Sequence, residues 1–556
     1  MSLRNCNSRG DPSGLPARHT QHRTNTNNRH VWHWRVAPAS GDCHLRSDSH
    51  LHWLIVFFLL LVSCAPTTAT QPAPTNTLEP TSPPPPTQTI EPPQLINPLT
   101  GLHVQDPSLL ELPALLVSIS HFPVTARPQA GLSFSPLVFE IYITEGATRF
   151  LTTFYGEFPA PESPVTGGCD TRREIFTQTN FILGNRAWLD ANQNNMQDAW
   201  ERGVGGVCVN LYDANLNLLQ QTTTDSNGYY GFNVSAGTYH IAVANPPQLE
   251  FAQKHVGDES RDSDVDPASG WSDAVNVEST LLSLDVGLIQ SSDILPSSTT
   301  LPEPKIGPIR SGRLVYADIA AMFTNSCLIY ALASPEVLTE LPQCVLVTHD
   351  IQGGGYMYGI DNLPAVARNY KEPKITIDYT SNTFSEEPPA GGMIADELHV
   401  FIAYLNQSGW EYDALSQSYW RSVDDASSDT AGILHPEVDR LTNRQLQFEN
   451  VVVLFAKHDV VSPTNLDIHL EANLTGDAIL FRDGLRYDIR WSTELSEEEI
   501  QTGVRKPIRF LYAGEDKLFP LKFGQTWVIV VTPETTVTEE FSSEWLLRFA
   551  QPEGAK

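Results

Sequence analysis

The segment DANQNNMQDAWE, residues 190–201, has the composition and spacing of a cation-binding loop. Oxygen-bearing side chains recur in it at short intervals, at Asp190, Asn192, Asn194, Asp198 and Glu201. On a tight loop these side chains would converge on one point, as calcium requires with its many oxygen ligands. The spacing resembles an EF-hand loop without its glycine and its full length. A solvated acidic loop is the alternative.

A second acidic run, RDSDVDP, places Asp262, Asp264 and Asp266 at alternate positions. Like charges this close repel one another, so the run would be costly to fold without a cation. We therefore predict that this run also binds calcium, with a solvated surface loop as the alternative.

Several arginines lie where strands are expected to end, and open sheets bind ligands at such places. The residues are Arg127, Arg149, Arg310, Ser311 and Arg313. A guanidinium can bind carboxylate or phosphate through two parallel hydrogen bonds, and PIRSGR precedes a predicted helix. These residues predict an anionic ligand site. An internal network of arginines and glutamates at the sheet edge is the alternative.

Two carboxylates are weak catalytic candidates: Glu140 inside an apolar strand, and Glu145 just after it. They would serve an envelope hydrolase. Ser311 lacks a GxSxG elbow, and the chain has no Walker A, HExxH or CxxC pattern. The aromatic residues Trp410, Tyr412, Tyr419 and Trp420 either stack on sugar rings or cap a hairpin. The sequence yields no enzyme assignment.

Residues 51–64, LHWLIVFFLLLVSC, form an apolar stretch that ends in a lipobox-like cysteine. A spanning helix needs about 20 apolar residues, whereas a secretory signal has a shorter apolar region. We predict a lipoprotein signal within 1–63, lipid attachment at Cys64, and a Pro/Thr-rich tether over 64–94. An uncleaved signal anchor is the alternative. Residues 1–50 do not resemble a folded segment, so we expect translation to start downstream of Met1.

The net charge of −30 argues against binding of nucleic acid or anionic headgroups by charge. With 41% hydrophobic residues the chain can still form substantial cores. The cysteines after the signal are too few for a disulfide scaffold. Cys327 and Cys344 either pair across neighbouring strands or stay as buried thiols.

The predicted elements indicate an α/β and all-β multidomain chain. We expect strands over 111–120, 135–143 and 148–158, a helix over 314–323, a strand–helix–strand unit over 327–347, and an amphipathic helix over 395–409. This alternation predicts a mixed α/β sheet domain formed by 95–160 and 305–440. Linker-like segments flank an all-β block, 181–290, which is therefore an insertion. A small antiparallel β subdomain is expected over 441–535, with a turn at FRDG.

The flanking regions resemble the YerB-like family of bacterial lipoproteins. The resemblance lies in NPLTGL (97–102), RPQAGLS (127–133), VFEIYITEGATRFLTTF (138–154), IGPIRSGR (306–313), ILFRDG and PLKFGQTWVIVV. In that family the TRFL strand runs almost directly into the PIRSGR-like loop, which agrees with an insertion here. The resemblance implies the fold and an extracytoplasmic location, but no chemistry.

The insert resembles the serine–aspartate-repeat B-type domains of surface adhesins, through ILGNRAWLDANQNNMQDAWERGVGGVCVNLYD and TTTDSNGYYGFNVSAGTYHIAV. The resemblance implies a prealbumin-like β-sandwich and calcium at both acidic runs, with help from Asp213 and Asp285. Asn195 departs from the glycine common at its position.

These observations predict a lipid-anchored, extracytoplasmic surface protein. Its core would be a non-catalytic binding domain for a cell-wall or glycan ligand, and its insert a calcium-binding spacer or adhesion module. A cell-envelope hydrolase and a structural scaffold that presents the insert are the alternatives.

Overall fold

The computed structural model describes residues 95–162, 167–169, 181–246, 248–290, 301–348, 355–462 and 465–555. The predicted signal, Cys64 and the tether lie outside these residues. Within the described ranges, no helix has the length and hydropathy needed to cross a membrane.

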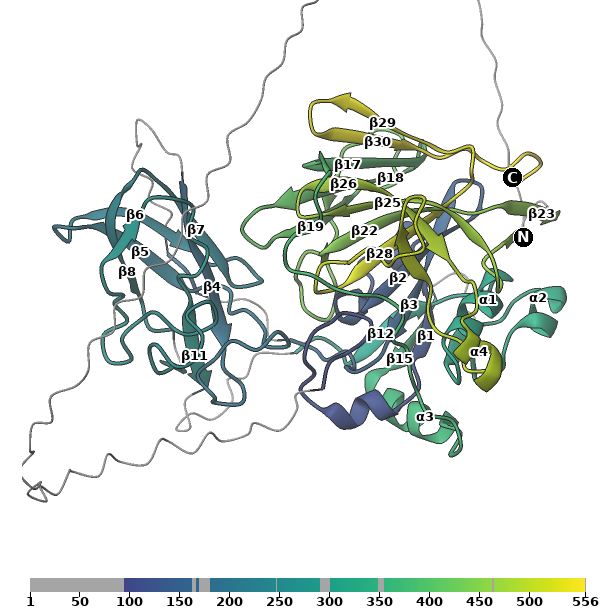
Figure 1. The fold of residues 1–556 in the computed structure, drawn as a ribbon, viewed down its shortest axis with the longest axis horizontal. Coiled ribbons are helices and arrows are strands. Elements are labelled where there is room, and N and C mark those ends of the chain that lie inside the picture. The colour runs from purple at the N-terminus through teal and green to yellow at the C-terminus, as the bar shows by residue number, and fades with distance from the viewer. Residues whose placement is uncertain are drawn as a thin grey trace, which may run out of the picture. The chain divides into compact units, whose positions relative to one another are not determined.

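A thirteen-stranded sheet forms the centre of the core (Figure 1). Its main path is β14 (Val345–Val347), β13 (Cys327–Ala331), β1 (Leu115–Ser120), β3 (Ala147–Phe154), β2 (Leu137–Thr144), β28 (Thr526–Val531), β22 (Asn450–Phe455), β25 (Thr475–Arg482), β26 (Leu485–Ser492) and β16 (Met393–Ile394). Beside this path, β12 (Lys305–Ile309) pairs with β1 and β15 (Tyr356–Gly359), and β27 (Arg509–Tyr512) pairs with β26.

The central strands are buried on both faces, which explains their continuous apolar runs. Every residue of β1 and of β28 is buried. Strand β28 lies between β2 and β22 and runs parallel to both. The expected sheet domain is therefore present, but the last third of the chain extends this sheet and does not form a separate antiparallel subdomain.

The helix expected over 395–409 is instead a hairpin of β17 (Glu397–Ala403) and β18 (Asn406–Asp413). Burial alternates along β17, with Leu398, Val400 and Ile402 inward. Parallel pairing with β30 (Glu544–Arg548) supplies the hydrogen bonds that favour a strand here.

This hairpin belongs to a seven-stranded sheet, in the order β20-β19-β18-β17-β30-β29, with β21 paired to β19. The remaining strands are β19 (Ser418–Val423), β20 (His435–Pro436), β21 (Gln447–Phe448) and β29 (Thr536–Phe541). One continuous apolar core joins both sheets. Trp410 and Tyr419 are fully buried in it, so these two rings are not exposed for stacking on sugars.

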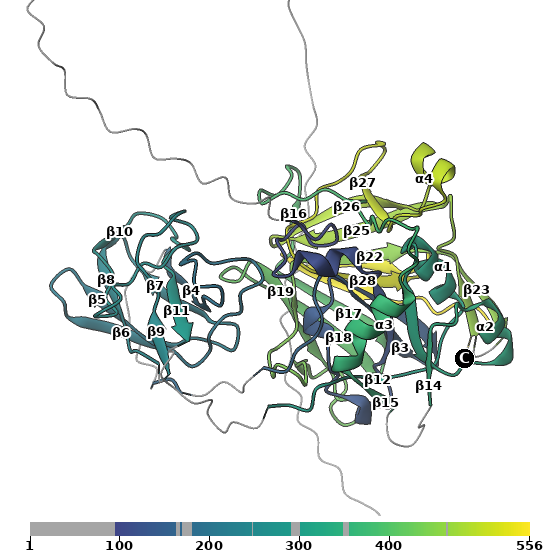
Figure 2. The same cartoon turned by 90° about the horizontal axis from the view of Figure 1, so that it is seen from below.

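Helices are few and short in the described residues. They are α1 (Val315–Met322), α2 (Pro335–Glu340), α3 (Leu363–Tyr370) and α4 (Glu497–Thr502), with 3-10 turns at Pro107–Glu111, Val124–Ala126, Leu132–Phe134 and Ile360–Asn362. The expected helix over 314–323 and the one after CLIYALA are both present. Tyr316 and Ile319 of α1 and Leu363 of α3 enter the main core. Figure 2 shows both helices beside the strands of the core.

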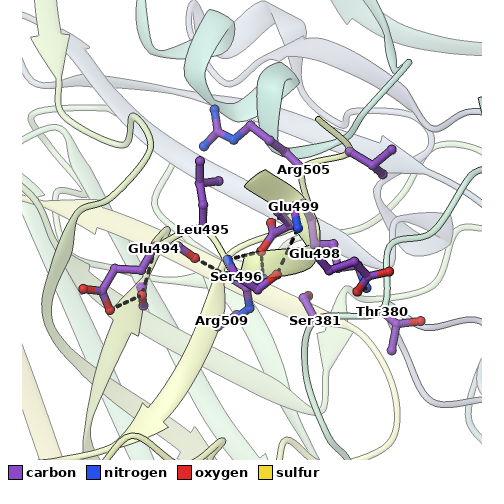
Figure 3. Close-up of polar contacts among 12 residues, drawn as sticks. Thr380, Ser381, Glu494, Leu495, Ser496, Glu498, Glu499, Arg505 and Arg509 are labelled. Carbon is purple, nitrogen blue, oxygen red and sulfur yellow. Dashed lines mark hydrogen bonds and ion pairs between the residues drawn. The ribbon is translucent and has the colours of Figure 1, made fainter. Parts of the chain in front are cut away.

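Helix α4 is stabilised by hydrogen bonds at its N-terminus. The Ser496 hydroxyl accepts from the Glu499 backbone N–H, and the Glu499 carboxylate accepts from the Ser496 N–H, which is a capping box (Figure 3). Arg509 of β27 pairs with the same carboxylate. This nearly buried glutamate thus fastens a one-turn helix to the edge of the sheet.

The insert is a β-sandwich with its own core. One sheet has the order β10-β8-β5-β6 and the other β7-β4-β11-β9. The strands are β4 (Phe181–Leu189), β5 (Cys208–Asp213), β6 (Leu218–Thr223), β7 (Tyr229–Val234), β8 (Gly237–Val243), β9 (Leu249–Phe251), β10 (Val275–Val277) and β11 (Val286–Gln290). Leu211, Phe232 and Ile241 are among the side chains that fill the space between the sheets.

A further hairpin, β23 (His458–Ser462) with β24 (Asn465–Ile468), belongs to the core region.

The described residues contain two disulfides: Cys327–Cys344 in the core, and Cys169–Cys208, which joins the segment before the insert to β5. The first settles the alternative left open for Cys327 and Cys344, since the bond ties β13 to the segment that enters β14. The second was not anticipated from the sequence.

We expect the double substitution Cys327→Ala/Cys344→Ala to lower the free energy of unfolding of the core by about 3 kcal/mol, because the bond closes a loop with a sequence separation of 17. Urea titration followed by tryptophan fluorescence measures the change. Cys169→Ala/Cys208→Ala is the control, because it acts on the insert and should leave the core transition in place. An unchanged core midpoint in the first variant would contradict the expectation.

Candidate functional site

Strand β3 contributes to two polar clusters through neighbouring residues. Side chains alternate between the faces of a strand, so Thr148 and Arg149 point to opposite sides. Thr148 contacts Glu140 and His121, whereas Arg149 contacts Ser311. The two clusters differ in how their charges are balanced.

The first cluster, the Glu140 network, consists of Glu140, Arg421, Glu437, His121, Thr148, Arg127 and Trp527. Arg421 of β19 is fully buried, 3.3 Å from Glu140 and 2.5 Å from Glu437. Its guanidinium lies 4.4 Å from the centre of the Trp527 ring. Two carboxylates and an aromatic face together compensate this desolvated charge.

The rest of the network holds Glu140 in one orientation. Thr148 donates to one carboxylate oxygen at 2.9 Å, and the Trp527 indole N–H donates to the other at 3.0 Å. His121 Nδ1 lies 2.9 Å from the Thr148 hydroxyl. Burial, with Arg127 and Arg421 adding to it, lowers the pKa of His121 well below its usual value. His121 is therefore neutral, and it donates from Nδ1 and accepts from Arg127 at Nε2.

Arg127 belongs to this network and not to the predicted anion site. It donates to His121 Nε2 at 2.8 Å and to the Asp424 carbonyl. Glu140 is buried and engaged on both oxygens, which leaves it no access to a substrate. Glu145, the other catalytic candidate, lies exposed in the β2–β3 turn with φ 52. The structure thus does not bring these two carboxylates together.

The second cluster, the arginine cluster, consists of Arg149, Arg310, Ser311 and Arg313. Arg149 donates to the Ser311 carbonyl at 3.0 Å and to its hydroxyl at 2.8 Å. Arg313 donates to the same hydroxyl at 3.3 Å and to the Gly312 carbonyl at 3.0 Å. Arg310 donates to Ser120 of β1 at 3.2 Å. The loop after β12 and the start of α1 thus bring together the residues predicted from PIRSGR.

No carboxylate among the described residues forms an ion pair with Arg149 or Arg313. The Nε–H groups of Arg149 and Arg313 are buried, and neither has a hydrogen-bond acceptor among the residues that the structure describes. Burial, with the charges of Arg313 and Arg310, lowers the pKa of Arg149 to about 9. At neutral pH the guanidiniums still carry their charge, so they repel one another in a poorly solvated place.

In the insert, the first acidic loop brings its predicted ligands together. Asp190, Asp198 and Glu201 are all buried. Burial raises the pKa of Glu201 to about 7, and the charges of Asp190 and Asp198 add to the effect. The amides of Asn192 and Asn194 donate to Asp198 at 2.8 and 3.0 Å. For both to serve as oxygen ligands, these amides would have to turn over.

The second acidic run is arranged differently from the sequence expectation. Asp266 is exposed and accepts from the backbone of its own turn, at Ala268 and Ser269. Asp262 and Asp264 are instead joined by His255, whose Nδ1 lies 3.6 Å and 4.0 Å from their carboxylate oxygens. His255 was not predicted as a partner of these aspartates, because it belongs to no local sequence motif.

Asp213 and Asp285, which the resemblance implied as further calcium ligands, differ in burial and in their hydrogen bonds. Asp213 is partly exposed and caps its own turn, where it accepts from Asn215 and Asn217. Asp285 is fully buried and accepts from the Arg186 backbone at 3.1 Å. Burial and the nearby Asp264 charge raise the pKa of Asp285 well above its usual value.

We expect Glu140→Gln to lower the free energy of unfolding by about 3 kcal/mol, because it removes one of the two carboxylates that compensate the buried Arg421 charge. Glu145→Gln is the matched control and should change stability by less than about 0.5 kcal/mol, as an exposed turn substitution does. Chemical denaturation of both variants provides the comparison. Equal effects would show that the network does not stabilise the core.

The model of the N-terminal domain of the family "Protein of unknown function (DUF3048)" matches residues 99–207, and that of its C-terminal domain matches 399–528. The SdrD B-like domain model matches residues 181–288. The YerB protein from Bacillus subtilis has a solved structure with 16% identity and a TM-score of 0.42, covering 79% of this chain and 97% of that one.

Two serine-aspartate repeat-containing proteins are similar to a part of the chain that is no longer than the insert. Serine-aspartate repeat-containing protein F of Staphylococcus epidermidis is 35% identical over 108 residues, 19% of this chain and 6% of that protein. Serine-aspartate repeat-containing protein C of Staphylococcus aureus (strain Newman) is 42% identical over 89 residues, 16% of this chain and 9% of that protein. The chain thus spans less than a tenth of the length of these relatives. It is a chain with the N-terminal and C-terminal domains of the DUF3048 family and an inserted SdrD B-like domain.

Proposed function

We propose that this chain is an extracytoplasmic surface protein, anchored through a lipid on Cys64, whose core binds an anionic ligand without catalysis. The insert would act as a calcium-binding spacer or adhesion module. The arginine cluster is the observation that carries the proposal, because Arg149 is buried and Arg313 half-buried, and neither forms an ion pair with a carboxylate among the described residues.

The two disulfides support the proposed location. Disulfides persist in oxidising surroundings and are rare in the cytosol. Cys169, Cys208, Cys327 and Cys344 form these two bonds among the described residues. Cys64 stands at the end of a signal-like apolar stretch, which is the position that lipid attachment requires.

The chemistry of the cluster favours a carboxylate or phosphate group. The unengaged Nε–H groups of Arg149 and Arg313 are strong donors, and charge-assisted hydrogen bonds to an anion would satisfy both. Acidic cell-wall fragments and acidic glycans present such groups. The net charge of −30 disfavours long anionic polymers such as nucleic acid. The hydrolase alternative lacks support from Glu140, which is buried within its network.

We expect inorganic phosphate or an acidic muropeptide to raise the melting temperature of residues 88–556 in a saturable way, at constant ionic strength against chloride. Binding at about 100 times the dissociation constant stabilises by about 2.7 kcal/mol. Arg313→Met should abolish the rise, and it should not destabilise the ligand-free protein, because it removes a repelled buried charge.

The control for this experiment is Arg368→Ala, which removes an exposed charge from α3 and should keep the full response. A response that survives Arg313→Met would place the anion elsewhere. No response from any anion would favour the scaffold alternative.

Calcium binding in the insert rests on the buried carboxylates of the first acidic loop. Burying three carboxylates without a cation costs folding free energy. Arg261 forms an ion pair with one of them, Asp198, at 3.0 Å. Calcium would offset the remaining charge with oxygen ligands from the same residues.

We expect millimolar calcium to raise the melting temperature of the insert by at least about 5 °C, as a domain of this size responds to a stabilisation near 1 kcal/mol. Asp198→Asn should remove the effect. Asp213→Asn, which changes a partly exposed aspartate outside the loop, should retain it. Calorimetric melting with and without a chelator provides the measurement, and equal melting of all samples would exclude the site.

A further inference from the structure

The second acidic run of the insert carries chemistry beyond the proposed function. We infer that His255, Asp262 and Asp264 form a binding site for a transition-metal ion of the zinc class, distinct in metal and ligands from the calcium loop. One ligand atom from each residue lies within 4.8 Å of the other two.

The spacing of the three atoms fits an ion between them. His255 Nδ1 lies 3.6 Å from Asp262 Oδ2 and 4.0 Å from Asp264 Oδ1, both too long for hydrogen bonds. A tetrahedral ion bound at about 2.0–2.2 Å holds its ligand atoms about 3.4 Å apart. The two distances from His255 are thus about 0.2 and 0.6 Å longer than this spacing.

Asp262 provides an independent sign of a missing ligand. The residue is only 3% exposed, yet its Oδ1 has no hydrogen-bond donor among the described residues. Asp264 is already oriented, because its Oδ2 accepts from the Asp285 backbone N–H at 2.7 Å, which leaves Oδ1 toward His255. A cation would compensate both carboxylates at once.

The second ring nitrogen of His255, Nε2, faces a carboxylate, as is usual for a metal-binding histidine. His255 Nε2 lies 3.5 Å from Asp273 Oδ2, and Lys254 holds that carboxylate at 2.7 Å. Metal-binding histidines generally donate their second N–H to such a carboxylate, which fixes the ring and its tautomer. Here that arrangement leaves Nδ1 as the metal-facing nitrogen.

The donor set decides the class of ion. Calcium prefers six to eight oxygens, about twice what this group offers, whereas imidazole nitrogen with carboxylates suits zinc and its neighbours. The His255 side chain is half exposed, so solvent can fill the remaining coordination position. Asp266 takes no part, because it caps its own turn.

The test uses residues 88–556, a compact unit that contains every described residue, after removal of metals with a chelator. Cobalt(II) titration followed by visible absorption, with zinc as competitor, should show one bound ion that zinc displaces and calcium does not. His255→Ala and Asp262→Asn should each abolish the cobalt spectrum. Asp273→Asn should weaken binding by about 10–100-fold.

Asp266→Asn is the matched control and should bind cobalt as the unchanged protein does. Far-UV circular dichroism and metal-free melting of each variant show whether the insert is folded, so a lost spectrum in a folded variant reports the site alone. Binding that survives His255→Ala, or that Asp266→Asn removes, would overturn the inference. A chain that binds neither cobalt nor zinc would also overturn it.

Discussion

The buried charge of Arg421 is the constraint on which the rest of the core depends. A fully desolvated guanidinium is stable only where opposite charges and donors surround it, and here these come from distant parts of the sequence. Glu140 lies in β2, Arg421 in β19, Glu437 just after β20, and Trp527 in β28. Once Arg421 is enclosed, the seven-stranded sheet can lie against the thirteen-stranded sheet only in the arrangement that brings these residues together.

The strand that contributes Thr148 to this network also carries Arg149, which forms no ion pair with a carboxylate among the described residues. Thr148 donates a hydrogen bond to Glu140 in the Glu140 network. The next residue, Arg149, is buried beside Arg310 and Arg313. Evolved cores rarely keep such repulsion without a use, because replacing one arginine by an apolar residue would relieve it. The contrast between the two sides of β3 is therefore a stronger argument for a ligand than the presence of arginines alone.

Sequence reasoning succeeded where the signal was local. The Asp483-Gly484 turn has positive φ at both residues, as FRDG predicts, and it joins β25 to β26. The 395–409 segment misled because Leu398, Phe401, Ile402 and Leu405 fit a helical face as well as a strand. The pairing of β17 with β30, more than a hundred residues away, decided between them. Glu437 and His255 were missed for the same reason, since their partners are brought to them by the fold.

The position of the insert follows from the hydrogen bonding of β1. The strand before the insert, β3, and the strand after it, β12, both pair with β1, with Ser118↔Leu151 and Ile119↔Ile309 in register. Both ends of the insertion are thus held by the same strand. Lengthening a loop between fixed ends costs little, about 0.6 kcal/mol for each doubling. Because the insert also has its own core, the chain can carry it without loss of the Arg421 arrangement.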